Sequence, residues 1–306
     1  MDDKLKILFA VDFSLSSKIA LKTLKLLQKK YKTDISMIHV IESFWKHWIT
    51  SGLYKKEAMQ RLQSWQKEIS KSSEERKLTI EIGNPADTII ELSRKRKSNV
   101  ILMGGKVTGE TGRYKTGTAV ESVVRSATKP VWICQRDKIS KILCGVDGSP
   151  SSGKALNFAI DLARRYSAQL CIMHALPNYL PALGMSDKSI QKEEEKFKIE
   201  NTNHIQKFLN SFTVKKIKLE TIIDWGDPAN ILLDHAEDFD FDLIVIGAKG
   251  HSLLHHVLLG STAEKVLRHT PDRRQRRGVQ HGCRHAALVS GYFISPPRAG
   301  CGYREQ

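Results

Sequence analysis

The chain has 306 residues and a net charge of +16, and it is long enough for two domains of about 150 residues, each with its own core. Its 41% hydrophobic and 27% charged residues are typical of a soluble globular protein. No apolar run approaches the roughly 20 residues of a membrane span, no signal-peptide core precedes the first strand, and the five cysteines form no CxxC pair. These features argue against a membrane protein, a secreted disulfide scaffold and a zinc module, and a cytoplasmic location is expected.

The positive charge by itself is a weak indication of nucleic-acid binding. The lysines are spread over helix-like segments, as at Lys22, Lys25, Lys29 and Lys30, which is typical of solvated helix faces. Neither a basic strand studded with aromatic residues nor a recognition helix is evident. Nucleic-acid binding is therefore kept as an alternative function and is not expected to be the main one.

Apolar, β-branched runs alternate with helix-like segments along the first part of the chain. Strands are expected at 7–11, 35–40, 78–82, 100–103 and 131–134, and helices at about 14–31, 43–72, 86–97 and 119–126. Ser14 or Ser16 is expected to cap the first helix, and the tryptophans at 45, 48 and 65 are expected to be packing groups. Short, nearly continuous apolar strands separated by helices predict a doubly wound, Rossmann-like parallel sheet. Ligands of such sheets bind beyond the carboxyl ends of the strands.

The same unit then repeats. Residues 6–14 (KILFAVDFS) match residues 141–149 (KILCGVDGS) at an offset of 135, and from residue 83 onward the offset is 143. A repeat this regular predicts two tandem copies of one domain, 1–137 and 138–270, each built on a five-stranded parallel sheet.

The loop at 247–261 is the strongest candidate for a ligand site. The apolar run 242–246 predicts a strand before it, Ser261 opens a helix-like segment after it, and glycines stand at 247, 250 and 260. A strand, a glycine-rich loop and a helix N-terminus present backbone N–H groups to a phosphate, with no Cβ in the way. The same residues taken alone also fit two ordinary turns, and Ser261 also fits a plain helix N-cap.

These motifs resemble the universal stress protein family in its tandem form. The resemblance covers residues 4 to about 271 and is carried by Val146-Asp-Gly-Ser149, Gly226-Asp-Pro228 and Gly247-x2-Gly250-x9-Gly260-Ser261. It implies an adenine nucleotide alpha hydrolase-like fold that binds ATP, with or without Mg²⁺ or Mn²⁺. It also implies intramolecular pairing of the two repeats, a homodimer, and a stress-response or signalling role rather than fast catalysis.

The resemblance assigns roles to residues of the second copy. Asp147 would accept hydrogen bonds from the nucleoside, and the backbone of Ala175 would meet the adenine edge. The residues that would line the phosphates are Gly247, Lys249, Gly250, Gly260 and Ser261. In the first copy Val107 stands where the second has Gly250, and its β-branched side chain would obstruct the phosphate. We expect the first copy to bind ATP weakly or not at all.

No catalytic constellation stands out, and a slow ATP hydrolase or transferase of the same fold remains the first alternative function. His255 and His256 lie inside the loop, but adjacent histidines face different directions on a helix, so a metal site is not expected. Asp238, Asp240 and Asp242 alternate along a turn into a strand and are expected to stay solvated.

Residues 271–306 depart from the pattern. The offset predicts an apolar strand at 271–276, but Pro271-Asp-Arg-Arg-Gln-Arg276 stands there, and the tail carries 7 arginines and no lysine. One interpretation is an arginine-rich tail that binds nucleic acid or anionic lipid. The interpretation that we favour is a shifted reading frame near codon 271, with disorder as a further outcome. As written, the second sheet is expected to lack its last strand, which is an edge strand.

Overall fold

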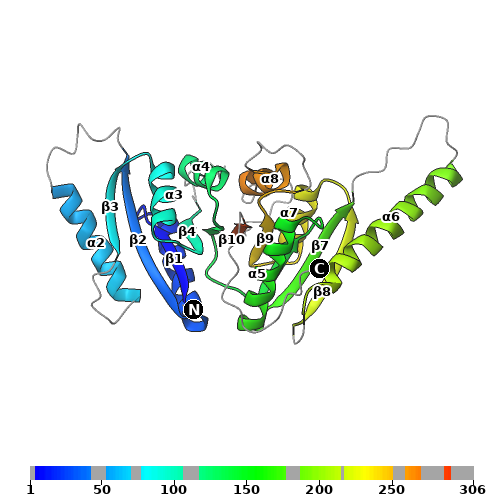
Figure 1. The fold of residues 1–306 in the computed structure, drawn as a ribbon, viewed down its shortest axis with the longest axis horizontal. Coiled ribbons are helices and arrows are strands. Elements are labelled where there is room, and N and C mark those ends of the chain that lie inside the picture. The colour runs from blue at the N-terminus through cyan, green and yellow to red at the C-terminus, as the bar shows by residue number, and fades with distance from the viewer. Residues whose placement is uncertain are drawn as a thin grey trace. The chain divides into compact units, whose positions relative to one another are not determined.

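The computed structural model describes most of both repeats and one short segment of the tail (Figure 1). The described residues are 4–42, 53–69, 77–105, 117–176, 187–214, 217–250, 259–269 and 286–290. They divide into two compact units, one within residues 1–138 and the other within residues 139–290. Among the helices described here, none is long and apolar enough to cross a membrane.

The first unit is a parallel sheet with strand order β3-β2-β1-β4-β5. Its strands are β1 (Leu5–Ala10), β2 (Thr33–Glu42), β3 (Leu78–Gly83), β4 (Val100–Gly104) and β5 (Val131–Cys134). Its helices are α1 (Leu15–Lys30), α2 (Leu53–Ile69), α3 (Pro85–Lys95) and α4 (Thr118–Ser126). The strand order reverses between β1 and β4, which is the switch point of a doubly wound sheet.

Local chemistry sets the ends of these helices. The Ser14 side chain accepts a hydrogen bond from the backbone N–H of Ser17 and caps α1, as expected. Asn84 caps α3, and Pro85 takes the first helical position, where its missing N–H costs nothing. Trp65 of α2 is 9% exposed and stacks on Phe9 at 6.2 Å, so its packing role is confirmed. The tryptophans at 45 and 48 lie outside the described residues.

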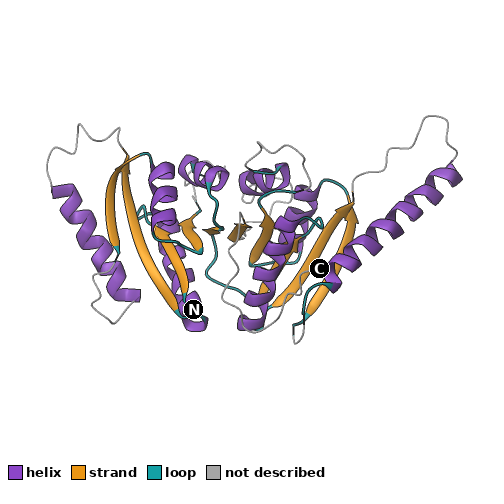
Figure 2. Ribbon diagram, viewed as in Figure 1, coloured by secondary structure: helices purple, strands orange, loops and turns teal. Residues whose placement is uncertain are grey.

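The second unit repeats this topology, with the order β9-β6-β7-β8. Its strands are β6 (Lys141–Gly145), β7 (Gln169–Leu176), β8 (Leu219–Trp225) and β9 (Leu243–Gly247). Its helices are α5 (Pro150–Tyr166), α6 (Asp187–Asn210), α7 (Pro228–Asp238) and α8 (Ser261–His269). Helices cover both faces of each sheet (Figure 2), which is why Ile142, Leu170 and Ile244 are completely buried.

The tail adds one strand to the second unit. The described part of residues 138–270 supplies four strands, as expected from the polar sequence at 271–276. Strand β10 (Ala286–Ser290) then pairs in parallel with β9, from Ala286 opposite Leu243 to Ser290 opposite Gly247. It takes the place beside β9 that β5 takes beside β4. The polar run at 271–276 itself lies outside the described residues.

One expectation about the aspartates is wrong. Asp242 is completely buried, and its Oδ2 accepts hydrogen bonds from Ser140 N (2.8 Å), Ser140 Oγ (2.7 Å) and Lys141 N (3.0 Å). In the first unit Asn99 makes the corresponding contact, because its Oδ1 accepts a hydrogen bond from Lys6 N at 2.7 Å. Both side chains join the start of one strand to the start of its neighbour. The Asp242 carboxylate is therefore not solvated but is a buried acceptor that joins the start of β9 to the start of β6.

Candidate functional site

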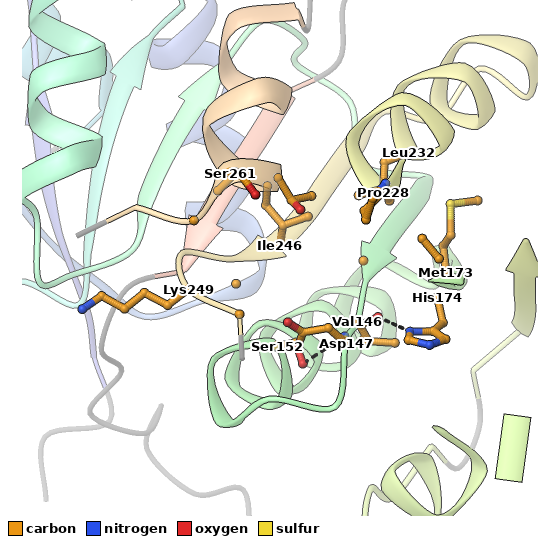
Figure 3. A pocket seen from close by; sticks show the side chains of 17 residues that line it. Val146, Asp147, Ser152, Met173, His174, Pro228, Leu232, Ile246, Lys249 and Ser261 are labelled. Carbon is orange, nitrogen blue, oxygen red and sulfur yellow. Dashed lines mark hydrogen bonds between the residues drawn. The ribbon is translucent and has the colours of Figure 1, made fainter. Parts of the chain in front are cut away.

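A cavity of about 270 Å³ lies in the second unit at the carboxyl ends of β6, β7 and β9 (Figure 3). The first turns of α5, α7 and α8 reach the same cavity through Ser152, Pro228 and Ser261. This convergence follows from topology, because each helix starts where the preceding strand ends. Helix N-termini carry unpaired N–H groups and a partial positive charge, so the cavity is suited to an anionic ligand.

All the residues that the sequence assigned to the ligand line this one cavity. They are Asp147, Ala175, Gly247, Lys249, Gly250, Gly260 and Ser261. The sequence argument did not single out the apolar walls, which Met173, Leu232 and Ile246 provide. Side chains of this kind in strands and helices also fit a closed core, and no local signal marks them as facing a cavity.

Asp147 is held in place where the chain turns from β6 into α5. Its Oδ1 accepts a hydrogen bond from Ser149 N at 2.9 Å, and Ser149 in turn caps α5 by accepting from Ser152 N at 3.1 Å. The other carboxylate oxygen faces the glycine loop, because a Cβ built on Gly250 would lie 2.6 Å from Asp147 Oδ2. A side chain at 250 therefore collides first with the Asp147 carboxylate.

Gly247 is required for packing between strand and helix. A Cβ at this position would lie 2.9 Å from the backbone N of Ser152 and 2.8 Å from Ser151 Oγ. Gly104 has the same constraint in the first unit, where a Cβ would lie 2.6 Å from the backbone N of Ser17. We expected Gly247 to leave room for a phosphate. The close approach of the α5 backbone already excludes a side chain at this position.

A backbone hydrogen bond of Gly260 joins the end of the loop to its beginning. Its N–H donates to the carbonyl oxygen of Ala248 at 2.7 Å, and its own carbonyl accepts from Glu264 N at 2.9 Å. Gly260 is thus the N-cap of α8, so the alternative interpretation of Ser261 as a plain N-cap does not hold. Ser261 is instead the first helical residue, with an exposed side chain at the cavity.

Lys249 is tied to α5 through its backbone. Its N–H donates to Ser151 Oγ at 3.3 Å, and its carbonyl accepts from Ser149 Oγ at 3.5 Å. Figure 3 shows its side chain extending away from Asp147 and from the centre of the cavity. Contact with a ligand in the cavity would require a change of rotamer.

His174 of β7 also lines the cavity, and at the offset of 135 it matches His39 of the first unit. Its Nδ1 lies 2.9 Å from the carbonyl oxygen of Val146, and the Nδ1 of His39 lies 2.8 Å from that of Val11. Since a carbonyl only accepts, Nδ1 carries the proton, and in the neutral ring Nε2 is left as an acceptor. The bond to Val146 fixes the ring at the wall of the cavity.

The corresponding strand ends of the first unit are packed differently. Asp12 Oδ1 accepts from Ser17 Oγ at 2.5 Å and from Ser14 N at 2.9 Å. Burial is the largest influence and raises the pKa of Asp12, but the hydrogen bonds from Ser14 and Ser17 together outweigh it, so this pKa lies below its ordinary value. The ring centroids of Phe13 and His39 are 4.7 Å apart. The Arg61 guanidinium carbon lies 4.2 Å from the centroid of the Phe13 ring.

The described residues contain no group of three or more His, Cys, Asp or Glu side chains arranged to hold a metal ion. The histidines at 255 and 256 lie outside the described residues. Cys134, Cys144 and Cys171 are buried free thiols, as expected. Burial raises the pKa of Cys134 to about 12, so this thiol stays protonated and unreactive.

Comparison with known proteins identifies the family. The model of the universal stress protein family matches the chain twice, at residues 5–135 and 138–271. Universal stress protein YxiE of Bacillus subtilis is 31% identical over 134 residues, which cover 42% of this chain and 90% of that protein. Universal stress protein Slr1230 of Synechocystis is 30% identical over 177 residues, 56% of this chain and 55% of that protein.

The fold comparison extends over nearly the whole chain. A universal stress protein from Archaeoglobus fulgidus superimposes with a TM-score of 0.62 at 19% identity, covering 94% of this chain and 99% of that chain. At this identity the likeness concerns the fold. Together with the two family matches, it shows that the chain belongs to the universal stress protein family and carries two consecutive domains of it.

Proposed function

We propose that the second unit binds ATP and that the protein is a nucleotide-dependent stress-response module. The observation that carries the proposal is one cavity that joins a fixed carboxylate, apolar walls, a glycine loop and three helix N-termini. Membership of the universal stress protein family supports the stress-response role.

The nucleoside would occupy the side of the cavity formed by β6 and β7. Asp147 Oδ2 would accept from ribose hydroxyls, and His174 Nε2 offers a second acceptor. Met173, Leu232 and Ile246 give apolar surface for the adenine ring, whose polar edge would meet the backbone of Ala175.

The phosphates would lie at the start of α8. The first N–H groups of this helix have no intrahelical partner, and Ser261, Thr262 and Ala263 all line the cavity. The Ser261 hydroxyl would add a donor, and Lys249 would add a positive charge after a change of rotamer. Mg²⁺ or Mn²⁺ would arrive with the nucleotide, since such ions are held largely by phosphate and water in sites of this kind.

Binding is favoured over rapid turnover by the position of the acidic group. Figure 3 shows Asp147 across the cavity from Ser261, on the side assigned to the nucleoside. A hydrolase needs a group that positions water at the terminal phosphate. Slow hydrolysis or phosphoryl transfer is the second candidate, and steady multiple turnover in a phosphate-release assay would support it over the binding module.

The nucleotide content of the purified full-length protein tests the proposal. Mass spectrometry of the released ligand should find ATP in the wild type, and titration calorimetry should give about one site per chain. Gly250→Val should weaken ATP binding by at least about tenfold, a loss of roughly 1.4 kcal/mol, because the side chain displaces Asp147. The control is Val107→Ala at the matching position of the first unit, which should leave binding unchanged. Equal binding by Gly250→Val and the wild type would contradict the proposal.

The composition favours a cytoplasmic protein, and the family resemblance implies that the repeats pair and the chains form a homodimer. Light scattering of the purified chain tests the last point directly. A mass of one chain, about 34.6 kDa, would exclude the dimer under those conditions.

A further inference from the structure

Basic side chains gather at the amino edge of the first sheet, the edge that carries the label N in Figure 1. They come from the start of β1, the end of α1 with the turn into β2, and the end of α3 with the turn into β4. We call this group the basic edge, and it consists of Lys4, Lys6, Lys29, Lys30, Lys32, Arg94, Lys95, Arg96 and Lys97. All are exposed except Lys6, which is half-buried.

Hydrogen bonds show that these segments are neighbours. The N–H of Leu5 donates to the carbonyl of Lys32 at 2.7 Å, and the N–H of Asn99 donates to the carbonyl of Lys6 at 2.7 Å. The starts of β2, β1 and β4 therefore lie in sequence along the sheet edge. Neighbouring strands are about 4.8 Å apart, so their charges form a row.

Two of the acids next to this row pair with lysines, and a third, Glu81, lies near Lys95. Asp34 pairs with Lys77, which directly precedes β3, and Glu91 pairs with Lys95 at 2.8 Å. The nine basic residues of the edge still outnumber the neighbouring acids Asp34, Glu81 and Glu91.

The second unit shows that the fold does not require this charge. At the offset of 143, Arg94-Lys95-Arg96-Lys97 corresponds to Glu237-Asp238-Phe239-Asp240. The two turns have the same shape, with φ of 52° at Lys97 and 51° at Asp240. Residues 1–137 carry 26 lysines and arginines against 15 acids, whereas residues 138–270 carry 16 of each. At the offset of 135, Lys6, Lys29 and Lys30 keep basic counterparts in Lys141, Arg164 and Arg165, so the basic turn at 94–97 is what distinguishes the first unit.

We propose that the basic edge binds the phosphate backbone of duplex nucleic acid without sequence preference. A row of lysines and arginines suits a linear polyanion, which carries one charge per about 1.7 Å of duplex axis. Within the described residues this edge presents no exposed aromatic ring, so contact is with phosphates rather than with stacked bases. The sequence argument against nucleic acid was that the lysines are scattered, and the topology brings them together.

An anionic membrane fits the edge less well. Proteins that lie on membranes combine basic residues with apolar side chains that enter the lipid. The exposed large apolar side chains described in the first unit, Leu15, Leu53, Tyr54 and Ile82, come from helix starts and a strand end. These belong to the carboxyl edge, on the opposite side of the sheet. The basic edge offers charge without an apolar anchor.

The test is fluorescence anisotropy of the full-length protein with a labelled random-sequence DNA duplex, measured across a series of salt concentrations. The variant Arg94→Gln, Arg96→Gln, Lys97→Asn removes three charges, and asparagine tolerates the positive φ at 97. We expect this variant to bind at least about tenfold more weakly at low salt and to reduce the salt slope by about 2–3. The control Lys55→Gln, Lys56→Gln, Lys67→Gln removes the same charge from the exposed side of α2 and should stay within about threefold.

A second control separates the edge from the tail. Neutralising Arg273, Arg274, Arg276 and Arg277 keeps the β10 residues and should leave most of the binding intact. Loss of binding in this variant or an equal loss in the α2 control would overturn the proposal. So would a wild type that fails to bind duplex at low salt, binds only vesicles containing phosphatidylserine, or merely self-associates. Thermal melting of each variant checks that folding is preserved.

Discussion

The Asp147 carboxylate occupies the space that a side chain at position 250 would need, since a Cβ on Gly250 would lie 2.6 Å from Asp147 Oδ2. A side chain at 250 and the Asp147 carboxylate therefore compete for the same space. In the first repeat the sequence has Val107 and Asp12 at the matching positions. The comparison explains why the two repeats are expected to differ in nucleotide binding.

The first prediction uses the contrast between two glycines of one loop. Gly250→Ala should weaken ATP binding by about tenfold or more, because the methyl group displaces the Asp147 carboxylate. Gly260→Ala places its methyl group 3.4 Å from the Ala248 carbonyl oxygen, an ordinary contact, and should stay within about threefold. Calorimetric titration of both variants with ATP measures the difference, and equal losses would show that the loop backbone, rather than the carboxylate, is what matters.

The second prediction concerns stability and has opposite signs at two glycines. Gly247→Ala should destabilise the second unit by about 1–3 kcal/mol, since its methyl group meets the rigid backbone of Ser151 and Ser152. Gly153→Ala, inside α5, meets only the rings of Phe208 and Phe212 at 3.4 Å or more and should stabilise by about 0.5–1 kcal/mol. Urea unfolding followed by circular dichroism gives both values. Destabilisation by both variants would show that Phe208 and Phe212 leave too little space for a methyl group at position 153.

The third prediction tests the hydrogen bonds that the Asp242 carboxylate accepts at the start of β9. Asp242→Ala should cost about 2–4 kcal/mol, because three donors on Ser140 and Lys141 lose their buried acceptor. Asp242→Asn should cost less, since Asn99 fills the same place in the first unit and accepts from Lys6. Chemical denaturation of the two variants decides this, and a harmless Asp242→Ala would mean that water replaces the carboxylate.

The fourth prediction concerns pH. The pKa of Asp12 is lower in the folded protein than its ordinary value, so the charged form is favoured by folding. A depressed folded pKa contributes stability that is present above the unfolded value of about 3.9 and is lost as the pH falls through the folded value. The stability difference between the wild type and Asp12→Asn should therefore be constant near neutral pH and shrink in acid. A difference that grows as the pH falls below about 4 would reverse the sign of the argument.

Much of the fold could be predicted from short-range patterns. The apolar runs placed β5 at its exact residues and the other strands of the first unit within two residues, because buried parallel strands leave a continuous local signal. The segment 286–290 was not predicted as a strand. No periodicity there indicates that it pairs with β9, a partner more than forty residues earlier in the chain.

The candidate site, too, was predicted from the sequence only in part. The glycine spacing and the family resemblance selected residues that line one cavity. Met173, Leu232 and Ile246 were missed because cavity walls and core have the same composition. Asp242 was misjudged because its three donors come from Ser140 and Lys141, about a hundred residues away in the sequence.

The amino-acid sequence by itself indicated the two domains, their parallel sheets and the residues of the candidate site, because periodicity, repetition and motif spacing can be read along the chain. Only the tertiary structure decided what each glycine is for, since Gly247 faces a helix backbone and Gly250 faces a carboxylate. It also gathered the lysines and arginines of separate segments into one edge. Which atoms meet across the sheet depends on chain topology, and a local pattern does not encode that.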